Sequence, residues 1–356
     1  MKGLHLVTIL LLLGPASPRL HTAPPVPHPK GYVCPFTPRP VVIDGVIDER
    51  EWHDAPWTGN FVDIEGDLRP LPRFRTRVRM LWDSTYLYIG AELREPNVWG
   101  TLTKRDTVIF NDDDFEVFID PNGDNHEYYE MEMNALNTVW DLFLDRPYRD
   151  GGKPRDGWDI AGLKTAVRVH GTLNNPADVD TGWTVEIAMP WKALGEYAHR
   201  TVPPSPGDQW RINFSRVEWR VDTTGGVSRR VPGTKEDNWV WSPQWVVDMH
   251  QPEMWGYLQF GGPGARQSAF RHDPSRPAEE ALMAVYRAQI EFRKAHGRWA
   301  ASRGELTLLQ KETYPFETPP AISLTGAGYI ASVTIRLPGG KKVSWFVTED
   351  SRLWHQ

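Results

Sequence analysis

The sequence has a single cysteine, no basic excess and no apolar run long enough to span a bilayer. Cys34 has no second cysteine to pair with, so an intrachain disulfide is excluded. The formal net charge is −6 and no basic stripe is present, which argues against a nucleic-acid partner. The apolar stretch at residues 4–13 is too short to cross a membrane as a helix.

Aromatic and turn-forming residues are abundant. The chain holds 17 Trp, 11 Tyr and 13 Phe, and its 31 Pro and 30 Gly indicate many turns. Short strands separated by turn residues, with little helix, are typical of an antiparallel β-sandwich of the jelly-roll or immunoglobulin-like kind. We therefore expect a mainly β protein that exposes aromatic surfaces.

The stretch at residues 110–145 organises this prediction. Apolar and polar residues alternate at 115–120 and again at 128–134, on either side of a PNGDN turn, so two strands are predicted that share one buried face. On the opposite face, pairing would bring together Glu116, Glu130, Glu132 and Asn134. Like charges side by side cost stability unless a cation, an arginine or a hydroxyl-rich ligand compensates, so this face is the candidate ligand site.

The chain divides into five predicted parts. Residues 1–23 have the charge, apolar run and small residues of an export signal, and residues 24–40 read as a Pro-rich linker. Residues 41–262 contain the predicted strands, including a hairpin at 78–93. Residues 263–277 are a second linker, and 278–356 combine an amphipathic helix at 278–296 with two strands in a small α+β module of unknown role.

An ordered series of motifs resembles carbohydrate-binding module family 9 over about residues 40–262. The motifs are IDGxIDExxW at 43–52, VRxLWDxxYLYI at 78–89, DDxFEVFIDPxGD at 112–124, YYExExN at 128–134, GWTVEIAMPW at 182–191, GDQWRINFSR at 207–216 and WGYLQF at 255–260. The resemblance implies a β-sandwich that binds plant-type glycans, carries structural calcium and often accompanies xylanases.

The family's binding residues are carried over position by position. The resemblance implies that Glu116 and Asn134 bind sugar and that Phe110 stacks on it. The second aromatic clamp of the family falls at Met249, where Trp245 or His250 would have to substitute, and an arginine of the family site is Glu132 here. These departures predict sugar binding that is weaker, different or lost.

The residue chemistry supports a sugar site independently of the resemblance. A pyranose has apolar faces and a hydroxyl rim, so it needs an aromatic surface with carboxylates and amides around it. Phe110, Glu116 and Asn134 supply these groups. Separately, Asp120, Asn122 and Asp124 offer oxygen ligands at alternate positions of a turn, which is a pattern that suits calcium but is equally common in acidic turns.

Two other functions remain as alternatives. No GxSxG, HExxH or glycine-rich phosphate loop occurs, but glycoside hydrolysis needs only two carboxyl groups, and Glu116 with Glu130 or Glu132 could supply them. On an open, wet face these groups would not gain the raised pKa of a general acid. Haem binding through Met249 and His250 is the second alternative, opposed by the fact that adjacent strand residues point oppositely.

The sequence thus predicts a secreted or periplasmic carbohydrate-binding protein that is not itself catalytic. Its expected partners are a polysaccharide or oligosaccharide and secreted glycoside hydrolases of polysaccharide catabolism. No membrane span is expected once the signal is removed.

Overall fold

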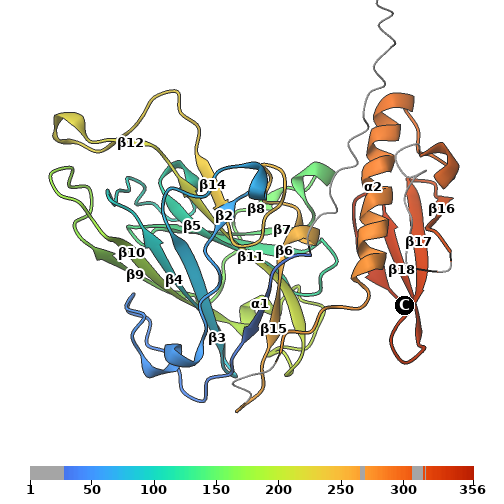
Figure 1. Ribbon diagram of the computed structural model, residues 1–356, viewed down its shortest axis with the longest axis horizontal. Helices are drawn as coiled ribbons and strands as arrows, with labels where there is room; N and C mark the ends of the chain where they lie inside the picture. Colours follow the sequence, from blue (N-terminus) through green and yellow to red (C-terminus); the bar gives the residue numbers. More distant parts are fainter. Residues whose placement is uncertain (1–27, 265–268, 307–315, 317) are drawn as a thin grey trace, which may run out of the picture.

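The computed structural model describes residues 28–264, 269–306, 316 and 318–356, which form a β-sandwich with a small α+β module beside it (Figure 1). The predicted antiparallel sandwich is confirmed. The export signal predicted at residues 1–23 lies outside the described residues. Among the described residues, no helix has the length and apolarity needed to cross a membrane.

The larger sheet of the sandwich has nine strands. Its main path runs β1-β15-β11-β5-β6-β7-β8, and β14 pairs with both β11 and β2. The bounds are β1 Gly31–Cys34, β2 Val62–Asp63, β5 Asp114–Asp120, β6 Tyr128–Asn134, β7 Val139–Leu144, β8 Pro154–Arg155, β11 Gln209–Glu218, β14 Asp237–Val240 and β15 Gly256–Phe260. Every pairing in this sheet is antiparallel except that of β1 with β15.

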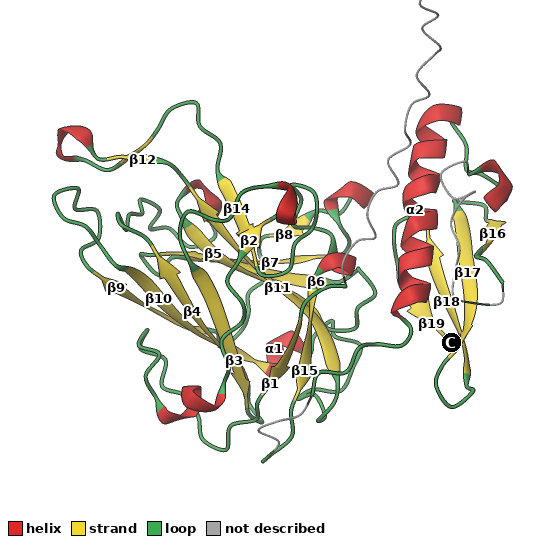
Figure 2. Cartoon of the chain, in the orientation of Figure 1, coloured by secondary structure: helices red, strands yellow, loops and turns green. Residues whose placement is uncertain are grey.

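The second sheet has four strands in the order β3-β4-β10-β9, and it faces the first across the core (Figure 2). Its strands are β3 Thr76–Trp82, β4 Tyr86–Arg94, β9 Lys164–His170 and β10 Gly182–Pro190, followed by the short helix α1 Trp191–Leu194. The predicted hairpin at 78–93 is therefore present as β3 and β4. A separate two-stranded ribbon is formed by β12 Val221–Asp222 and β13 Arg229–Arg230.

The core between the two sheets takes the apolar side chains that alternate along the strands. Phe115 and Val117 of β5 and Met131 and Met133 of β6 all lie in it. Because successive strand residues point to opposite faces, the polar partners of these residues are directed to the outer face of the larger sheet. The core thus fixes which residues form the candidate site.

The predicted linker at residues 24–40 needs a correction. Within it, β1 pairs in parallel with β15, and Cys34 is fully buried in the sandwich core. Four residues are too few to show a strand period, so this strand owes its formation to the partner that β15 offers rather than to a pattern of its own.

The C-terminal part has its own apolar core. Helix α2 Arg276–His296 packs on a four-stranded sheet of β16 Ala321–Leu324, β17 Tyr329–Arg336, β18 Lys342–Thr348 and β19 Leu353–His355. The helix includes the predicted segment 278–296 and ends at Gly297, which has the left-handed φ of 69° that terminates many helices. Figure 1 shows this C-terminal module at one end of the sandwich, with α2 on the side that faces it.

Candidate functional site

The predicted acidic residues lie together on the outer face of β5 and β6. In the observed register Glu116 lies opposite Glu132, Asp114 opposite Asn134, and Phe118 opposite Glu130. We call the surface formed by Asp114, Glu116, Glu130 and Glu132 the acidic face. The strand period predicted this grouping, with Asp114 as an additional member.

The acidic face is closed rather than open. The exposed fractions of Asp114, Glu116, Glu130 and Glu132 are 0%, 5%, 5% and 2%. The expectation of an open, wet face is therefore wrong, because the segments around Ile64 and Met249 pack on the outer side of the sheet, against side chains of β5, β6 and β7. Sequence periodicity shows which face a residue takes, but not what covers that face.

Burial changes the acidity of these carboxyl groups. It raises the pKa of Glu116 to about 7. Burial, and then the charge of Glu116, raise the pKa of Glu130 and of Glu132 above the usual range. A carboxyl group removed from water and placed beside other carboxylates ionises less readily, and both causes act here.

The acidic face has few hydrogen-bond donors. The backbone N–H of Phe110 donates to Glu132 Oε2 at 3.0 Å, and the N–H of Val217 donates to Asp114 Oδ1 at 3.0 Å. Glu130 Oε2 and Asp114 Oδ2 have no hydrogen-bond partner among the described residues. His250 Nε2 lies 3.9 Å from Glu130 Oε2, and burial lowers the pKa of His250 to about 3, so that ring is neutral at pH 7.

Asn134 is fully engaged within the protein. Its amide nitrogen donates to Leu102 O at 2.8 Å and to Asp112 Oδ2 at 2.9 Å, while its amide oxygen accepts the N–H groups of Leu136 and Thr138. The predicted contact of Asn134 with a ligand stays a prediction. In this structure, the amide holds the loop that follows β6.

Exposed rings lie around the acidic face. Phe110 is 40% exposed, and its carbonyl oxygen accepts the indole N–H of Trp219 at 2.9 Å, which fixes the residue at the rim. Tyr148 is 43% exposed, its ring lies 4.4 Å from that of His250, and the charge of Glu130 contributes to raising its pKa. Trp140 of β7 lies opposite Glu132 in the register. Sequence reasoning missed Tyr148 and Trp140, although the alternation around Trp140 was a signal for a third strand.

The predicted second clamp has a different environment. Met249 is 8% exposed and packs in the apolar cluster of Phe118 and Trp255, whose indole N–H donates to the Met249 carbonyl oxygen at 2.8 Å. Trp245 is half-buried and packs on Gly66, where an added Cβ would meet its ring at 2.4 Å. On this loop, the ring of His250 lies beside the acidic face, with its Nε2 3.9 Å from Glu130 Oε2.

His250 is held by a hydrogen bond to the sheet. Its Nδ1 lies 2.9 Å from the hydroxyl oxygen of Tyr128, whereas the neighbouring Met249 packs among apolar side chains. Met249 and His250 lie in a loop and not in a strand, so the alternation argument against a shared iron does not apply, and the haem alternative stays untested.

The predicted calcium turn is closed by its own hydrogen bonds. Asp120 accepts the N–H groups of Gly123 and Asn125 at 2.8 and 3.0 Å. Asp124 accepts the N–H of His126 at 2.9 Å and pairs with Arg352 at 3.3 Å, and Asn122 accepts the N–H of Asp124. These oxygens stabilise the turn and contact the C-terminal module, and the predicted binding of calcium by this turn stays a prediction.

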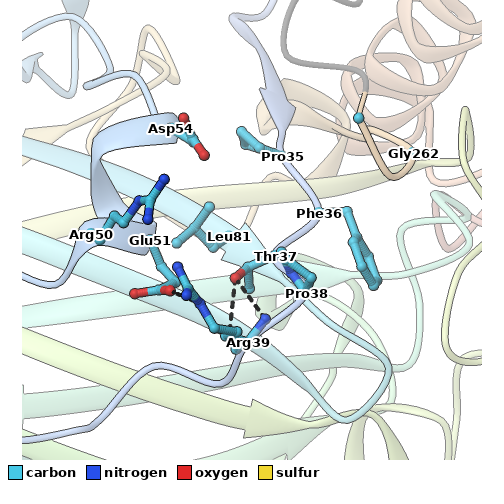
Figure 3. A pocket seen from close by; sticks show the side chains of 11 residues that line it. Pro35, Phe36, Thr37, Pro38, Arg39, Arg50, Glu51, Asp54, Leu81 and Gly262 are labelled. Atoms are coloured by element: carbon cyan, nitrogen blue, oxygen red, sulfur yellow. Dashed lines mark hydrogen bonds and ion pairs between the residues drawn. The ribbon is translucent and has the colours of Figure 1, made fainter.

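A hollow of about 360 Å³ lies elsewhere on the sandwich, between the segment after β1 and the segment that precedes β3 (Figure 3). Arg39 pairs with Glu51 across it at 2.6 Å, and the Thr37 hydroxyl donates to the Arg39 carbonyl oxygen at 2.7 Å. None of the predicted site residues lines this hollow.

The fold and the site define a β-sandwich with a closed carboxylate cluster and exposed rings on the outer face of one sheet. The family model described as Carbohydrate family 9 binding domain-like matches residues 43–231, just over half of the chain, so the chain belongs to this family.

Curated relatives share this region at low identity. The chain is 30% identical over 158 residues to Endo-1,4-beta-xylanase A of Thermotoga maritima and 28% identical over 155 residues to Exoglucanase XynX of Acetivibrio thermocellus. Each match covers 43% of this chain and 12% of the relative, so the chain matches only about an eighth of the length of these proteins.

Among solved structures, the chain is similar to a carbohydrate binding module family 9 from Caldicellulosiruptor kristjanssonii in complex with cellotriose. The identity is 17% and the TM-score 0.44, over 68% of this chain and 100% of the other.

Proposed function

We propose that the chain is a carbohydrate-binding protein whose ligand site is the acidic face and the rings around it. The observation that carries this proposal is the grouping of Glu116 and Glu132 with the exposed rings of Phe110 and Tyr148. Carboxylates accept hydroxyl protons, and a ring covers the apolar face of a pyranose. Membership in the family supports the same function.

The relatives support a substrate class. They are named as enzymes that act on β-1,4-xylan and on glucan, and the matched segment is a small part of each. We infer that this chain binds an oligosaccharide or polysaccharide of that kind, without cleaving it, in concert with secreted glycoside hydrolases. The export signal predicted at residues 1–23 supports an activity outside the cytoplasm, in polysaccharide catabolism.

Phe110 provides the direct test. Phe110→Ala removes an exposed ring from the rim, and we expect it to weaken binding of xylo- or cello-oligosaccharides by about 1–3 kcal/mol, because both apolar contact and a flat face are lost. Isothermal titration calorimetry on the full chain measures the change. Val179→Ala, at an 81% exposed position between β9 and β10, is the matched control.

Unchanged affinity in Phe110→Ala would place the ligand elsewhere on the molecule. Absence of binding to any glycan on an array, by a correctly folded wild-type chain, would refute the proposal itself.

Hydrolysis is a second candidate because of two features of the acidic face. The closest carboxylate oxygens of Glu116 and Glu132 lie within 4.8 Å of each other, near the separation of about 5–5.5 Å found in retaining glycosidases. The raised pKa of Glu116, about 7, suits a general acid. Release of shorter sugars by the wild type but not by Glu116→Gln, followed by chromatography, would favour this candidate.

A further inference from the structure

Four groups of three carboxylates have oxygens close enough to share an ion among the described residues. Three of them are already compensated by the protein. Arg216 lies 2.6 Å from Glu218 and 3.3 Å from Glu95 in the group that also contains Asp113.

The next two groups are compensated in other ways. Arg105 pairs with Asp141 and Asp159 in the group that includes Asp106. In the group of Asp44, Glu49 and Glu186, the Glu186 carboxylate accepts three N–H groups.

The fourth group, Asp114, Glu116 and Glu132, is compensated least, because Glu132 and Asp114 each accept only one backbone N–H of the described residues. The ligand oxygens of all three lie within 4.8 Å of one another, and all three residues are buried. Neither a lysine nor an arginine of the described residues forms an ion pair with them. The fourth group thus lacks both the arginine of the first two groups and the three donors that one carboxylate receives in the third.

A second observation points to a ligand at the same place. Glu130, which is outside the group, neighbours Glu132 on β6, is 95% buried and leaves its Oε2 without a hydrogen-bond partner among the described residues. Its charge acts on Glu132, as that of Glu116 does. An unpaired carboxylate oxygen of this kind is costly, and a buried one in a native protein generally has a partner.

We propose that the acidic face binds a hard divalent cation through Asp114, Glu116 and Glu132. Calcium takes six to eight oxygen ligands at about 2.3–2.6 Å, so oxygens that share one ion lie within about 5 Å of one another, as these do. The cation offsets the repulsion between the carboxylates and stabilises their ionised form. Carboxylate-only oxygen donors favour calcium over softer metals.

A cation at this site would also take part in sugar binding, and this role of the ion rests on the proposed function. Three carboxylates need not supply all of the six to eight oxygens that calcium takes. We infer that sugar hydroxyls, entering from the side of Phe110 and Tyr148, supply some of the others. Cation binding itself is measured without any glycan, so the two proposals can fail separately.

The test uses the full chain after chelation and dialysis. Calorimetry with Ca²⁺ should show binding to the wild type, and Ca²⁺ should raise the melting temperature above its value in EDTA, because the ion binds only the folded state. Glu132→Gln and Asp114→Asn should each weaken Ca²⁺ binding at least tenfold. The control is Asp120→Asn, at the other end of the same strand, which should keep the Ca²⁺ response.

Glu132→Gln also separates a lost site from a lost fold. Its melting temperature in EDTA should equal or exceed that of the wild type, since one of the repelling charges is gone, while its rise with Ca²⁺ should disappear. If neither variant folds, equilibrium dialysis of the wild type against millimolar Ca²⁺ tests whether the ion binds, and we expect one ion per chain.

Three results would overturn the proposal. The first is a wild-type chain that binds no ion and has the same melting temperature in Ca²⁺ and in EDTA. The second is Ca²⁺ binding that persists in Glu132→Gln, and the third is Ca²⁺ binding lost only in Asp120→Asn, which would put the ion in the 120–124 turn. Ca²⁺ binding without glycan binding would support the cation site and count against the proposed function.

Discussion

Glu186 is a single residue that attaches a whole segment to the sandwich. Its Oε2 accepts the N–H groups of Asp44 and Gly45 at 3.0 and 2.9 Å, and its Oε1 accepts the indole N–H of Trp52 at 2.8 Å. Gly45 has a φ of 88°, and an added Cβ would lie 2.7 Å from the Val167 backbone. The segment at 41–57 thus covers the outer side of the four-stranded sheet, held by this carboxylate together with apolar contacts of Val41, Trp52 and Ala55.

Glu186→Ala should lower the free energy of unfolding by about 2–4 kcal/mol, because it leaves three donors in a buried region without their acceptor. Urea denaturation measures the change. Glu51→Ala, which removes only the ion pair with Arg39 at the surface, should cost less than about 1 kcal/mol. Equal losses in the two variants would contradict this role of Glu186.

Glu116 should affect binding and stability in opposite directions. Glu116→Gln keeps the shape of the side chain but removes a charge that acts on Glu130 and Glu132. We expect glycan affinity to fall by about 1–3 kcal/mol, since a hydrogen bond to a charged group is lost, while the melting temperature in EDTA stays equal or rises. Calorimetry and parallel melts measure both. A lower melting temperature of Glu116→Gln in EDTA would mean that Glu116 is a structural residue.

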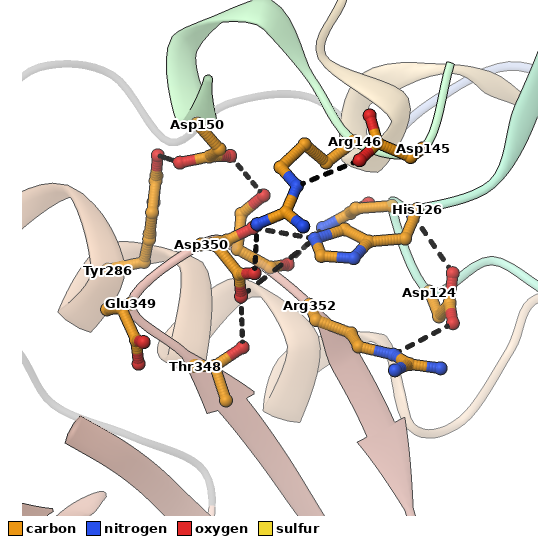
Figure 4. A network of polar contacts seen from close by, with 12 residues as sticks. Asp124, His126, Asp145, Arg146, Asp150, Tyr286, Thr348, Glu349, Asp350 and Arg352 are labelled. Carbon is orange, nitrogen blue, oxygen red and sulfur yellow. Dashed lines mark hydrogen bonds and ion pairs between the residues drawn. The ribbon is translucent and has the colours of Figure 1, made fainter. Parts of the chain in front are cut away.

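At the scale of elements, the C-terminal module contacts the sandwich through polar groups. The Tyr286 hydroxyl of α2 donates to Asp150 Oδ1 at 2.5 Å, and the Ser351 hydroxyl donates to Asp150 Oδ2 at 2.6 Å (Figure 4). Figure 4 also shows Asp350 and Arg352 beside His126 and Asp124 of the sandwich. Arg211 and Glu279, both nearly buried, pair at 2.7 Å.

These contacts bear on whether the sandwich folds without the C-terminal module. Truncation after Gly262 should leave a folded, soluble sandwich, because the module has its own core, but its melting temperature should fall below that of the full chain. The reason is that Arg211, Arg149 and Asp150 lose partners or covering surface on α2. Differential scanning calorimetry of the fragment and the full chain tests this. A fragment that melts at the unfolding temperature of the full-length sandwich would show that the contacts contribute nothing.

The contacts of Asp150 with the C-terminal module also affect the proposed ligand site. Asp150 ends the short 3-10 helix Tyr148–Asp150, and Tyr148 at its start packs on His250 beside Glu130. The C-terminal module therefore holds, through Asp150, the turn that presents Tyr148. Truncation should weaken glycan binding for this reason, even though no residue of the module lies in the acidic face.

A strand could be predicted from the sequence only where it is long enough to show an alternation of apolar and polar residues. The strands β5 and β6 are seven residues each, long enough to show a period of two, so their pairing and the grouping of Glu116 with Glu132 could be predicted. Strand β1 has only four residues, so it could not be predicted from a sequence period. The closure of the acidic face depends on loops around Ile64 and Met249, whose packing has no local signature.

At the scale of the whole molecule, buried carboxyl groups should make stability depend on pH. Burial raises the pKa of Glu218 to about 8 and that of Glu186 to about 7, above the value of about 4.3 expected in the unfolded chain. The folded state therefore binds more protons between these values, and the stability due to this protonation is lost as pH rises through the folded pKa. His250, with a pKa lowered to about 3, acts in the opposite sense only below about pH 6.5.

In EDTA we thus expect the free energy of unfolding to fall by about 1–2 kcal/mol between pH 6.5 and pH 8. Urea denaturation at several pH values measures the slope. Glu218→Gln should reduce it, since this residue titrates within the window. Stability that is constant or rises over this range would show that the buried carboxyl groups are ionised throughout.

The parallel pairing of β1 with β15 also determines how the protein would respond to force. The chain enters β1 at Gly31, next to Tyr257, and leaves β15 at Phe260, next to Cys34, so the two exits lie at opposite ends of the paired strands. Tension between the N-terminal segment and the C-terminal module would make the strands slide past each other, loading their hydrogen bonds together instead of opening them one by one. A protein fixed at one end and pulled at the other should therefore resist extension at this edge of the sheet.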